Sequence, residues 1–163
     1  MKYQFNIVPI IITCLFLVSC TPTVVSKFEL IEYGIVSVED KGWRKTEDPN
    51  FGRTHSVAFE KVKKETEQIQ AKIGTRFGMR FRIDGEPNKK TITVEYAGIH
   101  PQLTNPKTGK TFSSYKYQKK VKIGETRYMG YKFDHDWELV PGNWTLQVLY
   151  QGEVMVEKEF VVY

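Results

Sequence analysis

Cysteine is scarce in this sequence, and its placement limits the chemistry that the protein can perform. The 163 residues contain two cysteines, Cys14 and Cys20, so the chain from Thr21 to Tyr163 has none. That part of the chain cannot form an internal disulfide. The same lack excludes a thiol nucleophile, a cysteine-type zinc site and an iron–sulfur cluster after residue 20.

Residues for other kinds of catalysis are also sparse. The three histidines are far apart in the sequence, and no GxSxG motif or phosphate-binding glycine loop occurs. The best cluster is Asp134-His135-Asp136, in which two carboxylates and an imidazole could bind a divalent cation or transfer protons. On a strand, however, His135 would face away from both aspartates. We interpret the cluster as a polar turn before Trp137 and expect no catalytic residue, metal or cofactor.

Residues 1–19 have the pattern of a signal peptide. Lys2 precedes the nearly uncharged apolar stretch 7–18, which is shorter than the roughly twenty residues of a membrane-spanning helix. The tetrapeptide Leu17-Val18-Ser19-Cys20 resembles the lipobox of bacterial lipoproteins, in which the cysteine thiol is lipidated before cleavage. The sequence therefore predicts removal of residues 1–19 and lipid on Cys20. The alternative is an ordinary secretory signal that happens to end in cysteine.

The lipobox resemblance also implies where the protein lies. Several acyl chains, at roughly 0.8 kcal/mol for each buried methylene, would hold it to a membrane lastingly. Thr21 stands where retention at the inner membrane would usually require Asp, so we expect the periplasmic face of the outer membrane. Besides the membrane, an envelope protein or glycan is the expected partner. Nucleic acid is not expected, although the net charge is +5.

The remaining chain reads as one domain of strands. We expect residues 20–27 to be the lipidated cysteine and a tether, and 28–163 to be a single domain. Apolar and polar residues alternate in 77–84 and again in 90–98, which is the period of a half-buried strand. Weaker strands are predicted at 55–62 and 68–73. The segment 56–73 could alternatively be helical, because Glu, Lys, Gln and Ala dominate it.

The end of the chain gives the clearest indication of architecture. Two alternating runs, 144–150 and 153–163, are separated by Gln151-Gly152, a spacing that predicts a tight hairpin. The preceding segment 139–144 resembles the corner before the penultimate strand of immunoglobulin-like sandwiches. We therefore predict an all-β, immunoglobulin-like antiparallel β-sandwich, with other all-β barrels as the alternative.

Two groups of residues are candidates for contact with an anionic ligand or a glycan. In the first, aromatic and basic side chains alternate along one predicted strand, where they could bind acidic sugars or lipid headgroups. The alternative is an edge strand protected from aggregation by lysines. In the second, arginines on one strand could bind a carboxylate or phosphate, or form cross-strand ion pairs. The two groups are Tyr115, Lys116, Tyr117, Lys119 and Lys120, and Arg76, Arg80 and Arg82.

The sequence from residue 28 to 163 resembles an uncharacterised bacterial family, domain of unknown function 3859. The resemblance is carried by the segments IQAKIGTRFGMRFRIDGEP, HPQLTNPKTGK and GYKFDHDWELVPGNWTLQVLYQGEVMVEKEF. It implies a small all-β envelope protein and brings no known substrate or catalytic residue. The residues taken to match its pattern are Gly74, Phe77, Gly78, Pro101, Gly130, Phe133, Trp137, Glu138, Pro141, Gly142 and Trp144.

These observations predict a lipid-anchored envelope module that binds a partner or has a structural role, without catalysis. The ligand of such a module would contact loops or an edge strand of the sandwich. The alternative hypothesis is a hydrolase or metal-dependent envelope enzyme that uses Asp134, His135 and Asp136.

Overall fold

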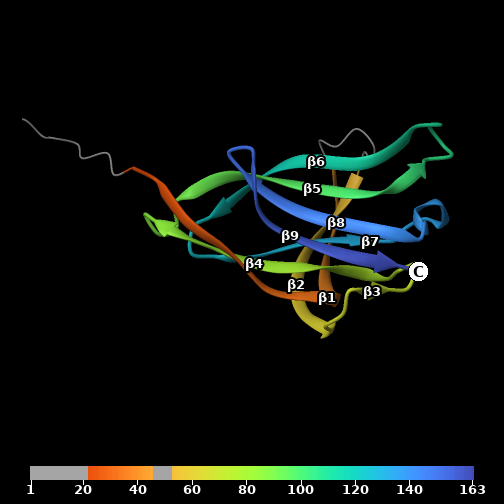
Figure 1. The fold of residues 1–163 in the computed structure, drawn as a ribbon, viewed down its shortest axis with the longest axis horizontal. Helices are drawn as coiled ribbons and strands as arrows, with labels where there is room; N and C mark the ends of the chain where they lie inside the picture. The colour runs from red at the N-terminus through yellow and green to blue at the C-terminus, as the bar shows by residue number, and fades with distance from the viewer. Residues whose placement is uncertain (1–21, 46–52) are drawn as a thin grey trace, which may run out of the picture.

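The structure is a computed structural model that describes residues 22–45 and 53–163, with the side chains of 40, 43–45 and 53–56 excepted. Within these residues the chain forms nine strands and one short 3-10 helix (Figure 1). In chain order they are β1 (Val24–Lys45), β2 (Arg53–Lys64), β3 (Gln68–Ile69), β4 (Arg76–Glu86), β5 (Thr91–Thr104), β6 (Thr111–Lys122), β7 (Thr126–Lys132), η1 (Asp136–Glu138), β8 (Gly142–Tyr150) and β9 (Glu153–Val162).

The strands form two sheets that pack face to face. One sheet has the order β2-β1-β4-β7 and the other has the order β3-β9-β8-β5-β6. The pairings are antiparallel except that between β3 and β9, which is parallel. The prediction of an antiparallel sandwich is confirmed.

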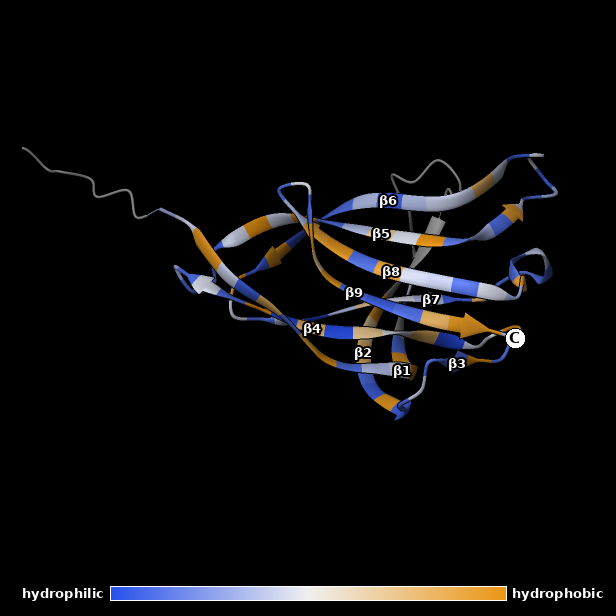
Figure 2. Cartoon of the chain, viewed as in Figure 1, coloured by the Kyte–Doolittle hydropathy of each residue, from blue (hydrophilic) through white to orange (hydrophobic). Residues whose placement is uncertain are grey.

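Alternating side chains of both sheets fill the space between them. Phe77, Phe81 and the other apolar residues of β4 point inward and are fully buried, as the alternation in the sequence predicted. They meet Trp144 of β8 and Phe160 of β9, with the rings of Phe77 and Phe160 5.0 Å apart. The strands accordingly alternate between apolar and polar residues (Figure 2). Burial of each large apolar side chain contributes about 1.5 to 3 kcal/mol to folding.

Strand β1 is much longer than either of its neighbours in the sheet, β2 and β4. Its first part, to Ile35, pairs with β4, and its second part pairs with β2. The two parts meet at Gly34, whose φ of +131° and close approach to the Lys64 carbonyl oxygen leave no room for a side chain. The resulting ribbon of β1 and β2 folds over the outer face of its sheet. There, Phe59 of β2 contacts Tyr128 of β7 at a ring distance of 5.6 Å.

The structure differs from two of the strand predictions and confirms the predicted hairpin. Segment 56–73 forms no helix: it is strand to Lys64, but after that only Gln68–Ile69 pairs, so 70–73 is not strand. Strand β1 begins at Val24, within the segment expected to be tether, because its first residues pair with the end of β4. The hairpin at Gln151-Gly152 forms as predicted, with φ of 54° and 88° at its two turn residues.

The two ends of the sandwich differ in what they carry. Strand β1 starts at one end, next to the turn between β4 and β5 (Figure 1). The β5–β6 hairpin, the turn between β7 and β8 that contains η1, and the last residues of β9 lie at the opposite end, which we call the loop end (Figure 1). Within the described residues, no helix is long and apolar enough to cross a membrane. The predicted signal peptide and Cys20 lie outside the described residues.

Candidate functional site

An open, shallow depression of about 500 Å³ lies at the loop end of the sandwich. Three connections that are distant in sequence supply its walls: the one before β4, the β5–β6 hairpin and the turn between β7 and β8. Ligand sites in proteins are concave, mostly apolar and provided with a few fixed polar groups. The residues that line the depression are Ile73, Pro106, Lys107, Asp134, His135, Asp136 and Trp137.

The turn between β7 and β8 is held in place by a buried carboxylate. Glu138 is only 3% exposed, and its Oε2 accepts hydrogen bonds from the backbone N–H groups of Asp134 at 2.6 Å and His135 at 2.9 Å. The hydroxyl of Tyr131 lies beside this carboxylate and favours its ionised form. Burial raises the pKa of Glu138 above 4.5, and the two backbone N–H groups oppose that rise because they stabilise the anion. The turn is therefore fixed by side-chain and backbone bonds together.

The β5–β6 hairpin is similarly preorganised. The side-chain oxygen of Asn105 accepts the N–H of Lys107 at 2.9 Å, and its backbone carbonyl accepts the N–H of Gly109 at 2.8 Å. Gly109 has φ of +68°, which lets the chain reverse without strain. The hairpin thus presents Pro106 and Lys107 to the depression from a defined loop.

Aromatic rings form one wall of the depression. The rings of His135 and Trp137 are stacked, with centroids 5.6 Å apart and planes at 17°. The ring of Phe112, from β6, meets Trp137 edge-on at 6.2 Å and supports it from the side of the hairpin. Contacts of this kind restrict the Trp137 side chain. The wall is therefore a supported aromatic surface that lines an open site.

The predicted cluster Asp134-His135-Asp136 does lie together in this depression, on a turn as expected. Asp134 forms an ion pair with Lys132. Among the described residues, no group of three or more histidine, aspartate or glutamate side chains is arranged to hold a metal ion. The cluster therefore contributes one ion pair and the exposed side chains of His135 and Asp136 to the depression.

The aromatic and basic residues of β6 do not share one surface. Strand β6 is at the edge of its sheet, as one of the two interpretations predicted. Tyr115, 9% exposed, points into the sandwich with Tyr117 and Lys119, whereas Lys116 and Lys120 are exposed on the opposite face. Tyr115 packs in the core and is not available to a ligand beside the lysines.

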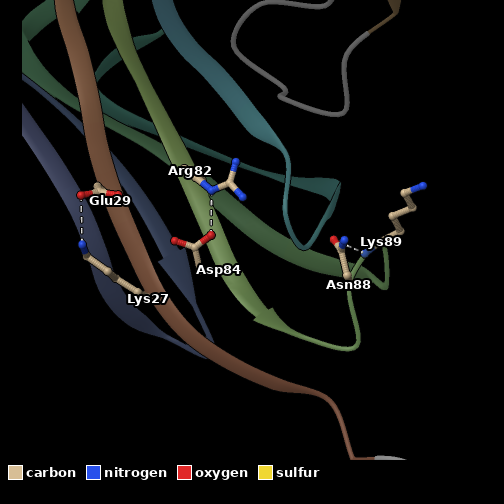
Figure 3. A network of polar contacts seen from close by, with 6 residues as sticks. All are labelled: Lys27, Glu29, Arg82, Asp84, Asn88 and Lys89. Carbon is tan, nitrogen blue, oxygen red and sulfur yellow. Dashed lines mark hydrogen bonds and ion pairs between the residues drawn. The ribbon is translucent and has the colours of Figure 1, made fainter.

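The arginines of β4 lie on the other sheet and each has a partner there. Arg80 pairs with Glu32 across the strands and lies over the ring of Phe59. Arg82 Nε donates to Asp84 at 2.7 Å (Figure 3). The hydroxyl of Tyr128 donates to the Phe77 carbonyl oxygen at 3.3 Å. Burial raises the pKa of this hydroxyl, and the nearby positive charge of Arg76 opposes the rise. The structure therefore does not bring these arginines together with the lysines of β6.

Sequence reasoning missed two buried polar residues near the loop end. One is Glu138, which its spacing three residues after His135 could have indicated, since a carboxylate at that spacing often caps a turn. The other is His100, which is 4% exposed, lies 4.9 Å from the ring of Trp144 and donates from Nδ1 to the Pro101 carbonyl at 2.7 Å. No local pattern in the sequence marks His100 as buried.

Comparison with known proteins identifies the family. The family described as "Domain of unknown function (DUF3859)" matches residues 24–162. The chain belongs to this family. No curated protein matches the sequence.

The DUF3859 chain resembles an immunoglobulin-like protein from Pseudomonas aeruginosa in structure. The TM-score is 0.61 at 25% sequence identity, and the match covers 85% of this chain and 98% of the other. The predicted immunoglobulin-like sandwich is thus confirmed. A Pseudomonas fluorescens alkylpurine DNA glycosylase bound to DNA with an abasic site analogue gives a TM-score of 0.38 at 18% identity. That match covers 59% of this chain and 27% of the other, which is too distant to carry an argument.

Several residues within the DUF3859 match have structural roles. Gly78 and Gly130 face each other across β4 and β7, and the ring of Tyr128 occupies the space beside them. Gly142 has φ of +134° and lies against Pro101. These residues shape the sheets and the loop end, and none of them lines the depression.

Proposed function

We propose that this protein is a lipid-anchored, non-catalytic binding module of the cell envelope that holds its ligand in the loop-end depression. The observation that carries the proposal is the preorganised depression itself, formed by three separate connections and lined by stacked rings with polar side chains around them. Hydrogen bonds fix two of the three connections before any ligand arrives, which lowers the entropy that binding costs.

The place of the depression suits a protein anchored through Cys20. Between Cys20 and the start of β1 at Val24 lie three residues, Thr21 to Thr23, which reach at most about 10 Å when extended. The start of β1 would thus be held close to the membrane, with the loop end directed away (Figure 1). Strand β5, with 14 residues, is roughly 45 Å long, so the depression would stand well clear of the lipid surface.

No observation among the described residues specifically favours the alternative of a hydrolase or metal-dependent enzyme. Asp134 is already paired with Lys132, and the ring of His135 is stacked on Trp137. The carboxylate of Glu138 is committed to the backbone of the turn. These contacts support a role for the cluster in shaping a binding surface.

Site-specific photo-crosslinking in living cells tests the proposal. A photoreactive amino acid replaces Lys107, at the rim of the depression, in the full chain expressed in a bacterium that processes lipoproteins. The matched control places the same group at Gln118, which is exposed on the outer face of β6. We expect a cross-linked species from position 107 and much less from position 118. Equal yields from both positions, or none from position 107, would contradict a ligand site at the loop end.

A further inference from the structure

The charges around the depression balance, and this balance limits the ligand. Lys107 and Lys132 contribute two positive charges, and Asp134 and Asp136 contribute two negative charges. An anion would meet the carboxylate of Asp136, and a cation would meet the ammonium of Lys107. Among these four side chains neither sign is in surplus, so the local electrostatics fit a ligand with no net charge.

The ring surfaces of the depression suit a flat, C–H-rich group. His135 and Trp137 line it as a stacked pair, and Ile73, which is 45% exposed, and Pro106 add apolar contact. One face of a pyranose ring presents mainly C–H groups, which pack on aromatic rings through the hydrophobic effect and dispersion. This combination of apolar surface and nearby polar groups is suited to a sugar.

Polar groups at the rim can hold the hydroxyls of the same sugar. The carboxylate of Asp136, on an exposed residue, has no hydrogen-bond partner within the described part of the chain, so both of its oxygens can accept hydroxyl donors. The ammonium of Lys107, from the β5–β6 hairpin, can donate to a hydroxyl oxygen. Charge-assisted hydrogen bonds of this kind are stronger than those between neutral groups.

We propose that the loop-end depression binds an uncharged sugar ring of an envelope glycan, between the His135–Trp137 stack and the side chains of Asp136 and Lys107. The inference rests on the proposed binding function and names the class of ligand. The depression is open and shallow, so a ring within a longer glycan can enter it while the chain continues on either side. A small molecule that must be enclosed on most sides would be held less well.

Calorimetric titration of the full chain in detergent with three oligosaccharides tests the ligand class. The probes are the tetramer of N-acetylglucosamine, which is uncharged, the tetramer of glucosamine, which has the same backbone and is cationic, and an anionic tetramer of galacturonic acid. We expect the uncharged tetramer to bind most tightly. Tighter or equal binding of either charged tetramer would overturn the inference.

Variants locate the binding within the depression. Asp136→Ala is expected to weaken binding of the N-acetylglucosamine tetramer about tenfold, the equivalent of one lost hydrogen bond to a charged group. Trp137→Leu is expected to weaken it at least as much. The control Lys120→Ala, on the exposed face of β6, should bind as the unaltered chain does. Unchanged binding in Asp136→Ala, an exposed position whose loss should not affect folding, would place the sugar elsewhere and refute the site.

Failure of the sugar inference and failure of the proposed function give different results. Cross-linking at position 107 in cells, together with no binding of the uncharged tetramer, would refute an uncharged sugar and leave the binding module standing. Absence of both signals would refute both. Tetramer binding that disappears in Asp136→Ala, accompanied by cross-linking at position 107, supports both.

Discussion

Glu138 shows how one residue can shape the loop end and set a pH dependence. Its carboxylate is buried beneath the turn between β7 and β8, where it accepts the N–H groups of Asp134 and His135. Burial raises its pKa above 4.5, so the folded protein keeps a proton on this group at pH values at which the unfolded chain has released it. The stabilisation from this proton is complete below the unfolded pKa and is lost as the pH rises through the folded pKa.

Replacement of Glu138 by Gln should remove that part of the pH dependence. The difference in free energy of unfolding between the unaltered protein and Glu138→Gln is expected to fall as the pH increases from about 4 to 7. Urea unfolding at a series of pH values measures it. Glu153→Gln, at an exposed position at the start of β9, controls for the loss of a charge. A difference that is constant or increases over this range would show that burial does not dominate the pKa shift of Glu138.

Gly130 is a residue at which a single methyl group should be costly. A Cβ atom there would lie 2.4 Å from the Phe77 carbonyl oxygen and 1.8 Å from the hydroxyl oxygen of Tyr128. Since one of these contacts is with backbone of a paired strand, Gly130→Ala is expected to lower the free energy of unfolding by about 3 kcal/mol. Chemical denaturation provides the measurement.

The control for Gly130→Ala is Gly109→Asn, in the β5–β6 hairpin. A Cβ atom at Gly109 meets nothing within 4 Å, and Asn tolerates its φ of +68° better than most residues. In that variant the free energy of unfolding should fall by less than about 1 kcal/mol. Equal losses of unfolding free energy in the two variants would mean that the close packing of β4 and β7 does not exclude a side chain at Gly130.

At the scale of elements, the sequence predicted those strands whose alternation is unbroken and missed those shaped by distant contacts. The alternation in β4 and the Gln151-Gly152 turn gave the right strand and hairpin because both signals are local. The length of β1 was not predictable, because irregularities in its pairing disturb the period and its second part pairs only with β2. Which face of β6 points inward depends on the opposite sheet, so alternation alone could not bury Tyr115.

The candidate site was predictable in part, for the same reason. The sequence placed Asp134, His135 and Asp136 on a polar turn, which the structure confirms. The approach of Pro106 and Lys107 to that turn depends on how β5, β6 and β8 pair, which no local pattern reveals.

The exposed lysines of β6 are expected to keep this edge strand from pairing with other molecules. Lys120 and Lys122 are exposed, and β6 has a neighbour on only one side within its sheet. The double variant Lys120→Val and Lys122→Val should aggregate with increasing concentration, while its unfolding temperature changes little. Light scattering detects the aggregation. The control is Lys72→Val with Lys110→Val, outside the strands. Monodisperse solutions of the β6 variant would show that the lysines are not needed for protection.

The β1–β2 ribbon should be held to its sheet by Phe59. The ring of Phe59 contacts Tyr128, and the guanidinium of Arg80 lies 4.4 Å from its centre. Phe59→Ala removes both contacts and is expected to lower stability by about 1 to 2 kcal/mol. Hydrogen–deuterium exchange should become faster in β2 and remain unchanged in β8 and β9. Equal acceleration in all strands would indicate that the ribbon is an integral part of the core.

At the scale of the whole molecule, the proposal depends on lipid attachment at Cys20. Replacement of Cys20 by Ala removes the thiol that would carry the lipid, so this variant is expected to lose labelling by a palmitate analogue and to leave the membrane fraction. Ser19→Ala keeps the thiol and a small residue before it, and it should remain labelled. Retention of both label and membrane association in Cys20→Ala would refute the anchor.

An anchored module with its ligand at the loop end should be covered there when it is in its native envelope. Hydrogen–deuterium exchange of the full chain, compared between native envelope vesicles and detergent micelles, measures where the molecule is covered. We predict slower exchange in the vesicles at residues 105–109 and 134–138, with exchange in strands β5 and β6 unchanged. Slower exchange in those two strands, together with no difference at the loop end, would contradict a binding module of the kind proposed.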